Sequence, residues 1–452
     1  MRVVLPFALL VAAALSSGAV LAETLNGALA KAYVTSPDLR NARANLRAVD
    51  ERISQALSGW RPTVSITGSG GVARNDPGSA TSSISTQHLN PLSGEFEVVQ
   101  PLYTGGKTEA AVRQAESDIL AARAGLKSAE QSVLLDAVRA YMDVLRDHAR
   151  LQLTANNEDV LKRQLEATQD RFDVGEVTRT DVAQAEARLA RATADRISAE
   201  GQLAVSSATY ERVIGEKPHD LEAVPPLPSL PATLRDALLI GLDENPDLEA
   251  ANHTERASKA AVRVAFGDLL PTLDLRGRVL RSRETSFESQ SSENDSILAQ
   301  VSIPLYQSGV EHSRVRESKE RQNQRRIQVE QARRLVIEQV TQAWEVLTST
   351  RSNITARNQE VRANEIALEG VREEASVGSR TTLDVLDAEQ ELLDARVALV
   401  EADRDEYVAG FSLLSAVGRL SAQLLGVPVE SYDPLTHYNK VRDKWWGLEP
   451  PE

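Results

Sequence analysis

The chain carries one sequence pattern twice, at constant spacing. The ten positions of the first copy that recur without a gap are Thr24, Leu25, Ala28, Leu29, Pro37, Asp38, Leu39, Pro62, Thr63 and Gly68, against Thr233, Leu234, Ala237, Leu238, Pro246, Asp247, Leu248, Pro271, Thr272 and Gly277. After a loop that is shorter in the second copy, the match resumes at Pro101-Leu102-Tyr103 and Pro304-Leu305-Tyr306. Such a duplication indicates that one structural unit is used twice in each chain.

The first residues are typical of a secretory signal peptide. Met1-Arg2 is followed by an apolar run and then by small residues that end at Ala22, where we expect cleavage. No other stretch approaches the ~20 apolar residues of a spanning helix, so we expect any membrane span to be β. The chain contains no cysteine, which excludes disulfides and thiolate metal sites and suits a bacterial envelope protein.

Composition narrows the fold and the partners. Only 4% of the residues are aromatic, and this favours long helices over a wide globular core. The net charge of −14 argues against a nucleic-acid partner. The six histidines are scattered without metal-ligand spacing, so we expect neither a structural metal nor a cofactor.

Two long tracts without proline predict helical hairpins. Apolar residues recur there at three- and four-residue steps with charged residues between them, as in amphipathic helices. Lys107 to Asp173 would form a rod of ~100 Å at 1.5 Å per residue. Val174-Gly175 and Val377-Gly378 interrupt the tracts, so we expect one hairpin over residues 107–215 and a second over residues 310–418.

Each hairpin is preceded by two predicted strands with alternating polarity. The expected strands are Thr63 to Ala73, Gly94 to Tyr103, Thr272 to Arg283 and Ser296 to Tyr306. Polar loops join them, Asn75 to Gly94 in the first copy and Glu284 to Asp295 in the second. Each strand has about the ten residues of a tilted membrane crossing. Pro62 and Pro271 break the incoming helices where the strands begin.

Four strands cannot close a barrel alone, because small closed barrels need about eight. Unpaired strand edges are not tolerated in lipid, so several subunits must pool their strands. Three subunits would supply a twelve-stranded barrel, and the same trimer would set its helices into a hollow cylinder.

The chain is therefore similar to the TolC family of outer-membrane efflux channels, over Thr24 to Gly418. The similarity rests on the order of strands and helices, the duplication, the proline-flanked strands, and the turn motifs that begin at Val174-Gly175 and Val377-Gly378 and end at Asp181-Val182 and Asp384-Val385. It implies an α+β membrane protein: a homotrimer with a β-barrel in the outer membrane, continuous with a periplasmic α-helical barrel. It also implies docking to a periplasmic adaptor and an inner-membrane pump.

Two carboxylates after the second turn, Asp384 and Asp387, are candidate gate residues. They lie three apart on one helix face near its start, where acids also simply stabilise a helix by about 0.3–1 kcal/mol. The first copy has Asp181 but Gln184 at the matching positions, so only the second hairpin has the pair. The family resemblance implies two acidic rings around the trimer axis. We expect them to concentrate cations and, by mutual repulsion, to have raised pKa values.

The resemblance also implies a gate tether. In the family pattern an arginine, here Arg380, holds the inner hairpin to Thr180 and Asp181 on the neighbouring hairpin. A tyrosine assists it in the family, but the matching position here is Ala375. At the hairpin tips Val174, Gly175, Val377 and Gly378 are candidates for adaptor docking, and the two glycines are expected to take positive φ.

The expected domains are a signal peptide (1–22), a first repeat (23–215) with a β-hairpin at 63–103, a proline-rich linker (216–232), a second repeat (233–418) with a β-hairpin at 272–306, and a periplasmic C-terminal tail (419–452). The predicted function is a gated exit duct in the outer membrane, for multidrug efflux or type I protein secretion, without catalysis. One alternative is a periplasmic coiled-coil adaptor or scaffold, which leaves the paired strands unexplained. A secreted hydrolase is disfavoured, because no nucleophile, base and orienting group appear together.

Overall fold

The computed structural model describes residues 23–75, 87–285 and 291–450. The expected signal peptide, and parts of both expected strand-connecting loops, lie outside the described residues. The elements in chain order are α1 Leu25–Thr35, α2 Pro37–Leu57, the 3₁₀ turn η1 Ser58–Trp60, β1 Thr63–Gly70, β2 Ala73–Asn75, β3 Gln87–Leu89, β4 Leu92–Tyr103, α3 Lys107–Asp173, α4 Arg179–Ile214, α5 Leu234–Glu244, α6 Pro246–Gly267, β5 Thr272–Arg283, β6 Ser291–Ser302, α7 Val310–Ser376, α8 Thr382–Ala416 and α9 Pro434–Arg442. Across these described ranges, no helix has the length and apolar character needed to cross a membrane.

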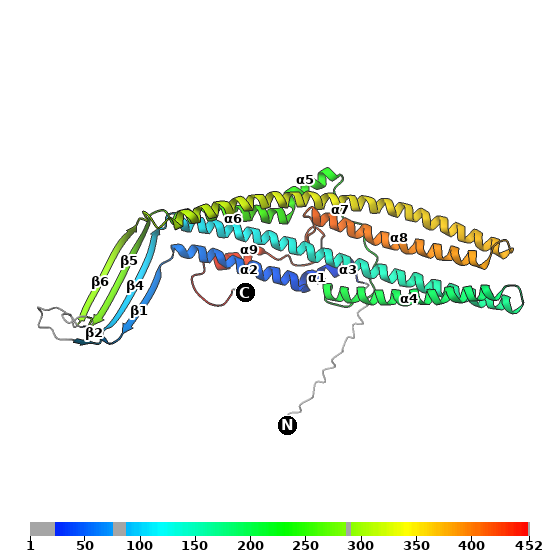
Figure 1. The fold of residues 1–452 in the computed structure, drawn as a ribbon, viewed down its shortest axis with the longest axis horizontal. Helices are drawn as coiled ribbons and strands as arrows, with labels where there is room; N and C mark the ends of the chain where they lie inside the picture. Colours follow the sequence, from blue (N-terminus) through cyan, green and yellow to red (C-terminus); the bar gives the residue numbers. More distant parts are fainter. Residues whose placement is uncertain (1–22, 76–86, 286–290, 451–452) are drawn as a thin grey trace, which may run out of the picture.

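Two helices of 67 residues each, α3 and α7, set the long axis of the molecule. α3 turns back into α4 and α7 into α8, at the end opposite the strands (Figure 1). Near the strands the neighbours are α2, α3, α6 and α7, and toward the hairpin tips they are α4, α3, α8 and α7. The arrangement therefore has four helices side by side at each level.

The two repeats begin their helices in the same way. Ser36 caps α2 by accepting a hydrogen bond from the Leu39 amide, and Asn245 caps α6 by accepting from the amides of residues 247 and 248. A proline follows each cap as the first helical residue, where its missing N–H costs nothing. Equivalent sequence in the two copies thus produces equivalent helix starts.

The largest apolar core lies at the middle of the long axis, where α1, α3, α4 and α8 meet the linker and the C-terminal tail. Tyr141 and Tyr210 are fully buried there, with ring centroids 6.4 Å apart. The Tyr141 hydroxyl lies 2.8 Å from the main-chain oxygen of Glu23 and 2.7 Å from that of Glu222. This side chain therefore joins the start of the first repeat and the linker to α3.

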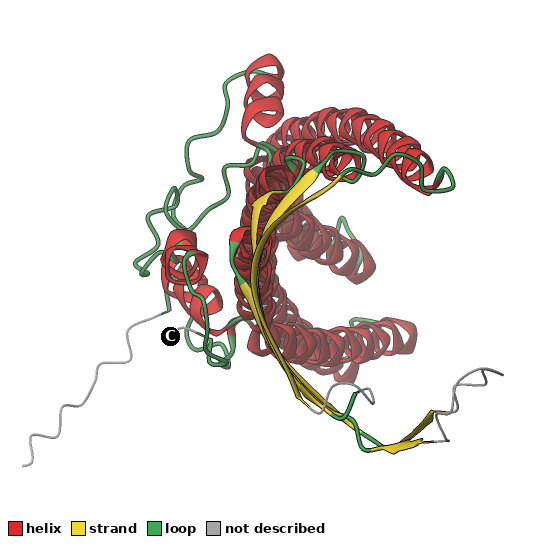
Figure 2. Ribbon diagram, turned by 90° about the vertical axis from the view of Figure 1, so that its left-hand side faces the viewer, coloured by secondary structure: helices red, strands yellow, loops and turns green. Residues whose placement is uncertain are grey.

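The four long strands form one antiparallel sheet in the order β1-β4-β5-β6. Seen along the long axis, the sheet and the helices follow one open arc (Figure 2). β1 and β6 each pair on one side only among the described residues. The sheet thus ends in two free edges.

The two faces of this sheet differ in chemistry. The cross-strand register places apolar side chains on one face, and they are Val64, Ile66, Phe96, Val98, Leu273, Leu275, Val279, Ile297 and Val301. The opposite face carries ion pairs between β4 and β5, in which Arg278 contacts Glu95 and Arg276 contacts Glu97. A sheet of this kind separates an apolar medium from a polar one.

The bounds of three expected strands were wrong. β1 ends at Gly70, and residues 73–75 pair instead with β3 as a small separate hairpin. β4 begins two residues early, at Leu92. β6 runs over Ser291–Ser302 rather than 296–306, because Glu293 and Asp295 both lie within ion-pair distance of Arg281 on β5 and extend the ladder. Their polarity suggested a loop, whereas they form cross-strand pairs.

The C-terminal tail contains a helix, α9, that the sequence did not predict. α9 packs on α2 through a small apolar cluster with Val441 and Ile53 at its centre. The buried His437 Nδ1 lies 3.2 Å from Oδ2 of the buried Asp50 in the same interface. Burial raises the pKa of Asp50, and His437 opposes that rise.

Candidate functional site

The two hairpin tips have the same backbone geometry. Gly175 and Gly378 take φ of 81° and 78°, as predicted, and no heavy atom lies within 4 Å of a Cβ built on either. Glycine is therefore required by the left-handed backbone and not by crowding. Val174 and Val377 precede these glycines with 72% and 79% of their surface exposed. Each tip thus presents an exposed valine to solvent.

Each returning helix begins with a capping box. In α4 the Thr178 amide donates to Asp181 (2.8 Å), and in α8 the Thr381 amide donates to Asp384 (2.9 Å). Each threonine hydroxyl accepts in return from the amide of its aspartate. The pKa of both aspartates is held below its usual value. The hydrogen bond from the threonine amide is the larger cause, and the hydrogen bond from the threonine hydroxyl is the second.

In the single chain the pKa of Asp384 is shifted downward, whereas the expected rise concerns acids that meet around a trimer axis and stays a prediction. Repulsion between crowded carboxylates was expected to raise the pKa, but within one chain the capping hydrogen bonds lower it. Asp384 and Asp181 perform the same capping task, so the stabilisation of a first turn accounts for the position of Asp384. Its place in an acidic ring stays a prediction.

Asp387 is paired with Arg188 of α4. The pair joins the second hairpin to the first near their tips, with 26% of the Arg188 side chain and 51% of the Asp387 side chain exposed. Next to it, the buried Leu386 packs against Leu161 of α3 and Ala192 of α4. An ion pair and an apolar contact therefore hold the start of α8 against the first hairpin.

Arg380 contacts its own turn. Its Nε donates to Glu374 at 2.8 Å, and both side chains are about half exposed. Among the described residues of the single chain no hydrogen bond or ion pair joins Arg380 to Thr180 or Asp181, and the Asp181 carboxylate accepts from Thr178 instead. A tether from Arg380 to these residues on another hairpin stays a prediction.

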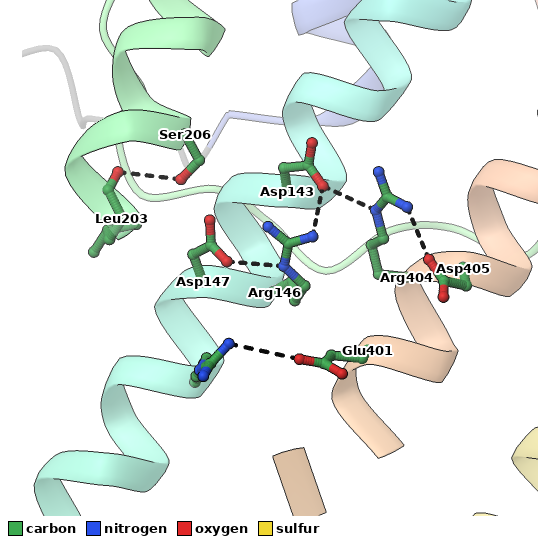
Figure 3. Close-up of polar contacts among 9 residues, drawn as sticks. Asp143, Arg146, Asp147, Leu203, Ser206, Glu401, Arg404 and Asp405 are labelled. Atoms are coloured by element: carbon green, nitrogen blue, oxygen red, sulfur yellow. Dashed lines mark hydrogen bonds and ion pairs between the residues drawn. The ribbon is translucent and has the colours of Figure 1, made fainter. Parts of the chain in front are cut away.

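A second link between the hairpins lies farther from the tips, between α3 and α8 (Figure 3). Asp143 of α3 accepts from Arg404 of α8 at 2.9 Å and also contacts Arg146 at 3.0 Å. Arg146 in turn donates to Asp147, whose side chain is only 1% exposed. Hydrogen bonding to Asp147 raises the pKa of Arg146.

Arg188 and this network were not predicted from the sequence, although the repeat contained a signal for both. At the position of Arg188 the second copy has Glu391, of opposite charge. Asp143 matches Val346, and Arg404 matches Gly201. The two copies thus differ in charge at these positions, so the contacts of Arg188, Asp143 and Arg404 are not repeated in the other copy.

No group of three or more histidine, cysteine, aspartate and glutamate side chains is placed to hold a metal ion in the part of the chain that the structure describes. The site consists of turns, caps and ion pairs between helices. Such parts can fix or release the relative position of two hairpins.

Comparisons with known proteins agree with this architecture. The family model described as "Outer membrane efflux protein" matches residues 28–216 and 241–419, which correspond to the two repeats. The outer membrane efflux protein BepC of Brucella suis is 36% identical over 439 residues, which are 97% of this chain and 94% of BepC. The outer membrane protein TolC of Escherichia coli is 26% identical over 427 residues, covering 89% of this chain and 83% of TolC.

Solved structures show the same fold. The Campylobacter jejuni CmeC outer membrane channel superposes with a TM-score of 0.77 at 16% identity, over 93% of this chain and 89% of CmeC. At that identity the likeness concerns the fold alone.

Proposed function

Because this chain belongs to the outer membrane efflux protein family and forms an efflux channel of the outer membrane, we propose that it works as a homotrimeric exit duct that is gated at its periplasmic end. The proposal includes no catalysed reaction. A periplasmic adaptor and an inner-membrane pump are the proposed partners, as the resemblance to the TolC family implies.

The observation that supports the trimer is the open sheet with two free edges. The apolar side chains Ile66 of β1 and Ile297 of β6 are 82% and 79% exposed on these edge strands. An unpaired edge in lipid leaves backbone groups without partners, at a cost of several kcal/mol per group. Pairing β1 of one copy with β6 of the next would satisfy both edges and would close three sheets into one twelve-stranded barrel.

Disulfide crosslinking tests this closure, because the chain has no cysteine of its own. Within one chain β4 and β5 separate β1 from β6, which places the edge strands ~14 Å apart at ~4.8 Å per strand. A disulfide needs Cα atoms within about 7 Å. Ile66→Cys combined in turn with Ile297→Cys, Ala299→Cys or Val301→Cys should therefore crosslink one subunit to the next and give covalent dimers and trimers. No disulfide should form between the two cysteines of one chain.

The matched control is the pair Phe96→Cys and Val279→Cys. These residues lie opposite each other on β4 and β5 of one chain, so their disulfide should leave the chain monomeric in a denaturing gel. A β1 to β6 series that never yields covalent trimers in the outer membrane would contradict the proposed barrel.

We place the gate at the start of α8. The proposed roles are acidic rings for Asp384 and Asp387, a tether for Arg380 with Thr180 and Asp181, and adaptor docking for the tips at Val174, Gly175, Val377 and Gly378. The exposed valines and the ion pair of Asp387 with Arg188 support a gate that is held by a few weak polar contacts.

A further inference from the structure

Residues 443–450 return to the helix that leads into β1. We call residues 443–450 the tryptophan segment. The Arg61 guanidinium donates to the main-chain oxygen of Lys444 at 2.9 Å, and the Ser54 hydroxyl donates to the same oxygen at 3.0 Å. Arg61 is two residues before β1, so these bonds hold the segment at the junction between helices and strands (Figure 1).

The segment carries large apolar side chains that the chain itself leaves uncovered. The Arg61 guanidinium lies 5.0 Å from the ring centre of Trp445, which is still 63% exposed. Trp446 is 88% exposed and Leu448 is fully exposed. Two of the four tryptophans of the chain are therefore side by side in solvent, next to the first membrane strand.

Other strand ends at this junction are exposed and apolar as well. Trp60 is 48% exposed before β1, Tyr103 is 50% exposed at the end of β4, and Tyr306 is 80% exposed after β6. Aromatic side chains gather at this level of membrane proteins because their rings suit the boundary between headgroups and acyl chains. Trp445 and Trp446 therefore lie at the same level as the exposed aromatic residues Trp60, Tyr103 and Tyr306 at the strand ends.

Charge at the segment also fits a lipid surface. Lys440, Arg442 and Lys444 precede the two tryptophans, with Asp443 among them and Glu449 after them, so residues 440–450 are weakly basic, whereas the whole chain has a net charge of −14. Basic residues beside interfacial aromatic residues are attracted to anionic headgroups.

We propose that the tryptophan segment is a membrane anchor, in which Trp446 and Leu448 enter the periplasmic leaflet of the outer membrane beside the barrel. This anchor rests on the proposed function, because it assumes that β1, β4, β5 and β6 cross that membrane. Arg61 would fix the anchor to the barrel, so that the C-terminal tail ties α2 and α9 to the membrane surface.

Quenching of single-tryptophan channels by brominated lipid tests the anchor. The full chain with Trp60, Trp344 and Trp445 replaced by phenylalanine keeps Trp446 as its one fluorophore. It is reconstituted in vesicles of phosphatidylethanolamine and phosphatidylglycerol whose acyl chains are brominated near the carbonyl end. We expect a blue-shifted Trp446 emission that brominated lipid quenches, and a reduced quenching when Leu448→Glu is added.

Two further single-tryptophan chains make the result decisive. A chain that keeps only Trp344, on α7 in the helical part, should escape quenching. A chain without native tryptophans but with Ile297→Trp, on the apolar face of β6, reports whether the strands enter the bilayer. Quenching of the Ile297→Trp chain without quenching of Trp446 would overturn the anchor alone, and absence of both would overturn the anchor and the membrane barrel together.

The emission wavelength identifies what else covers the segment. An unquenched Trp446 with the emission of a water-exposed indole would mean that the segment stays in the periplasm. An unquenched but blue-shifted Trp446 would mean that a neighbouring copy of the chain covers it. Either result contradicts insertion into lipid.

Discussion

The guanidinium of Arg188 on α4 is paired with the carboxylate of Asp387 on α8, so the two hairpins of one chain are linked close to their tips. The start of α8 is the segment proposed to close the periplasmic end. Because neither side chain is buried, the link is weak enough to break when the hairpins move apart.

Reversing the charge of one partner should open the periplasmic end, and reversing the charges of both partners should close it again. Exposed ion pairs contribute about 0.2–1 kcal/mol, so Arg188→Ala should raise the ratio of open to closed channels about 1.4- to 5-fold. Arg188→Asp should raise it further by repelling Asp387. Adding Asp387→Arg to Arg188→Asp should return single-channel conductance in planar bilayers toward that of the parent, and a double variant as open as Arg188→Asp would show that the pair does not hold the gate.

Arg380 gives a separate prediction. Its bond to Glu374 is exposed and local, so the guanidinium is free to exchange partners at little cost. If it reaches Thr180 or Asp181 on a neighbouring hairpin, Arg380→Ala should increase conductance, and Arg380→Lys should give an intermediate value because lysine cannot bond bidentately. Glu374→Gln is the control, since it removes only the local pair. Equal conductance of the parent and Arg380→Ala channels would remove Arg380 from the gate.

The sequence predicted the fold class because the repeat fixed the topology and the periodicity fixed the helices. Proline-free tracts indicated helices over Lys107 to Asp173 and Val310 to Ser376, and the structure has α3 and α7 there. Helix-breaking residues are local signals, so these bounds follow from local sequence. The strand bounds depended on cross-strand partners such as Arg281, and a single strand does not contain that information.

The site was less predictable for the same physical reason. Capping by Asp181 and Asp384 is local, and the sequence placed both acids at helix starts. The contact of Asp387 with Arg188 joins residues that are far apart in the chain and depends on how the two hairpins pack. α9 was missed because it is short and its stability comes from packing on α2, not from its own sequence pattern.

The acidic pair should determine cation block. Carboxylates around a narrow axis repel each other and concentrate cations, and a trivalent cation that bridges subunits would plug the pore. Hexamminecobalt(III) added on the periplasmic side should block the parent channel, and Asp384→Asn with Asp387→Asn should abolish the block while trimers remain. Asp181→Asn is the matched control, because Asp181 makes the same cap in the first hairpin. Equal block in the double variant would leave both acids as ordinary first-turn residues.

The pH dependence of that block follows from the capping box. The Thr381 amide and hydroxyl lower the pKa of Asp384, so its charge and its cap are fully present above the ordinary aspartate pKa of about 4. Both are lost only as pH falls through the lowered value. We therefore expect trivalent block to persist from pH 7 to about pH 4 and to weaken below that. Thr381→Val removes the hydroxyl, so it should move the loss of block to higher pH, and a loss already at pH 6 in the parent would contradict the capping geometry.

The network between α3 and α8 should act as the fixed point about which the tips separate. Arg404 and Asp143 are 22% and 26% exposed, so salt should screen their attraction less than that of a surface pair. We expect Arg404→Ala to lower the free energy of unfolding by about 1–2 kcal/mol and to raise conductance, because α8 loses its shorter ion pair with α3 and keeps only the pair of Glu401 with Arg150, at 3.6 Å. The matched control is Arg351→Ala, which removes an ion pair with Glu406 inside the second hairpin, where the arginine is 52% exposed. Since that pair joins α7 to α8 and leaves α3 untouched, its loss should not change conductance. Thermal unfolding and single-channel recording at low and high salt measure both effects, and equal behaviour of the two variants would mean that α8 pivots elsewhere.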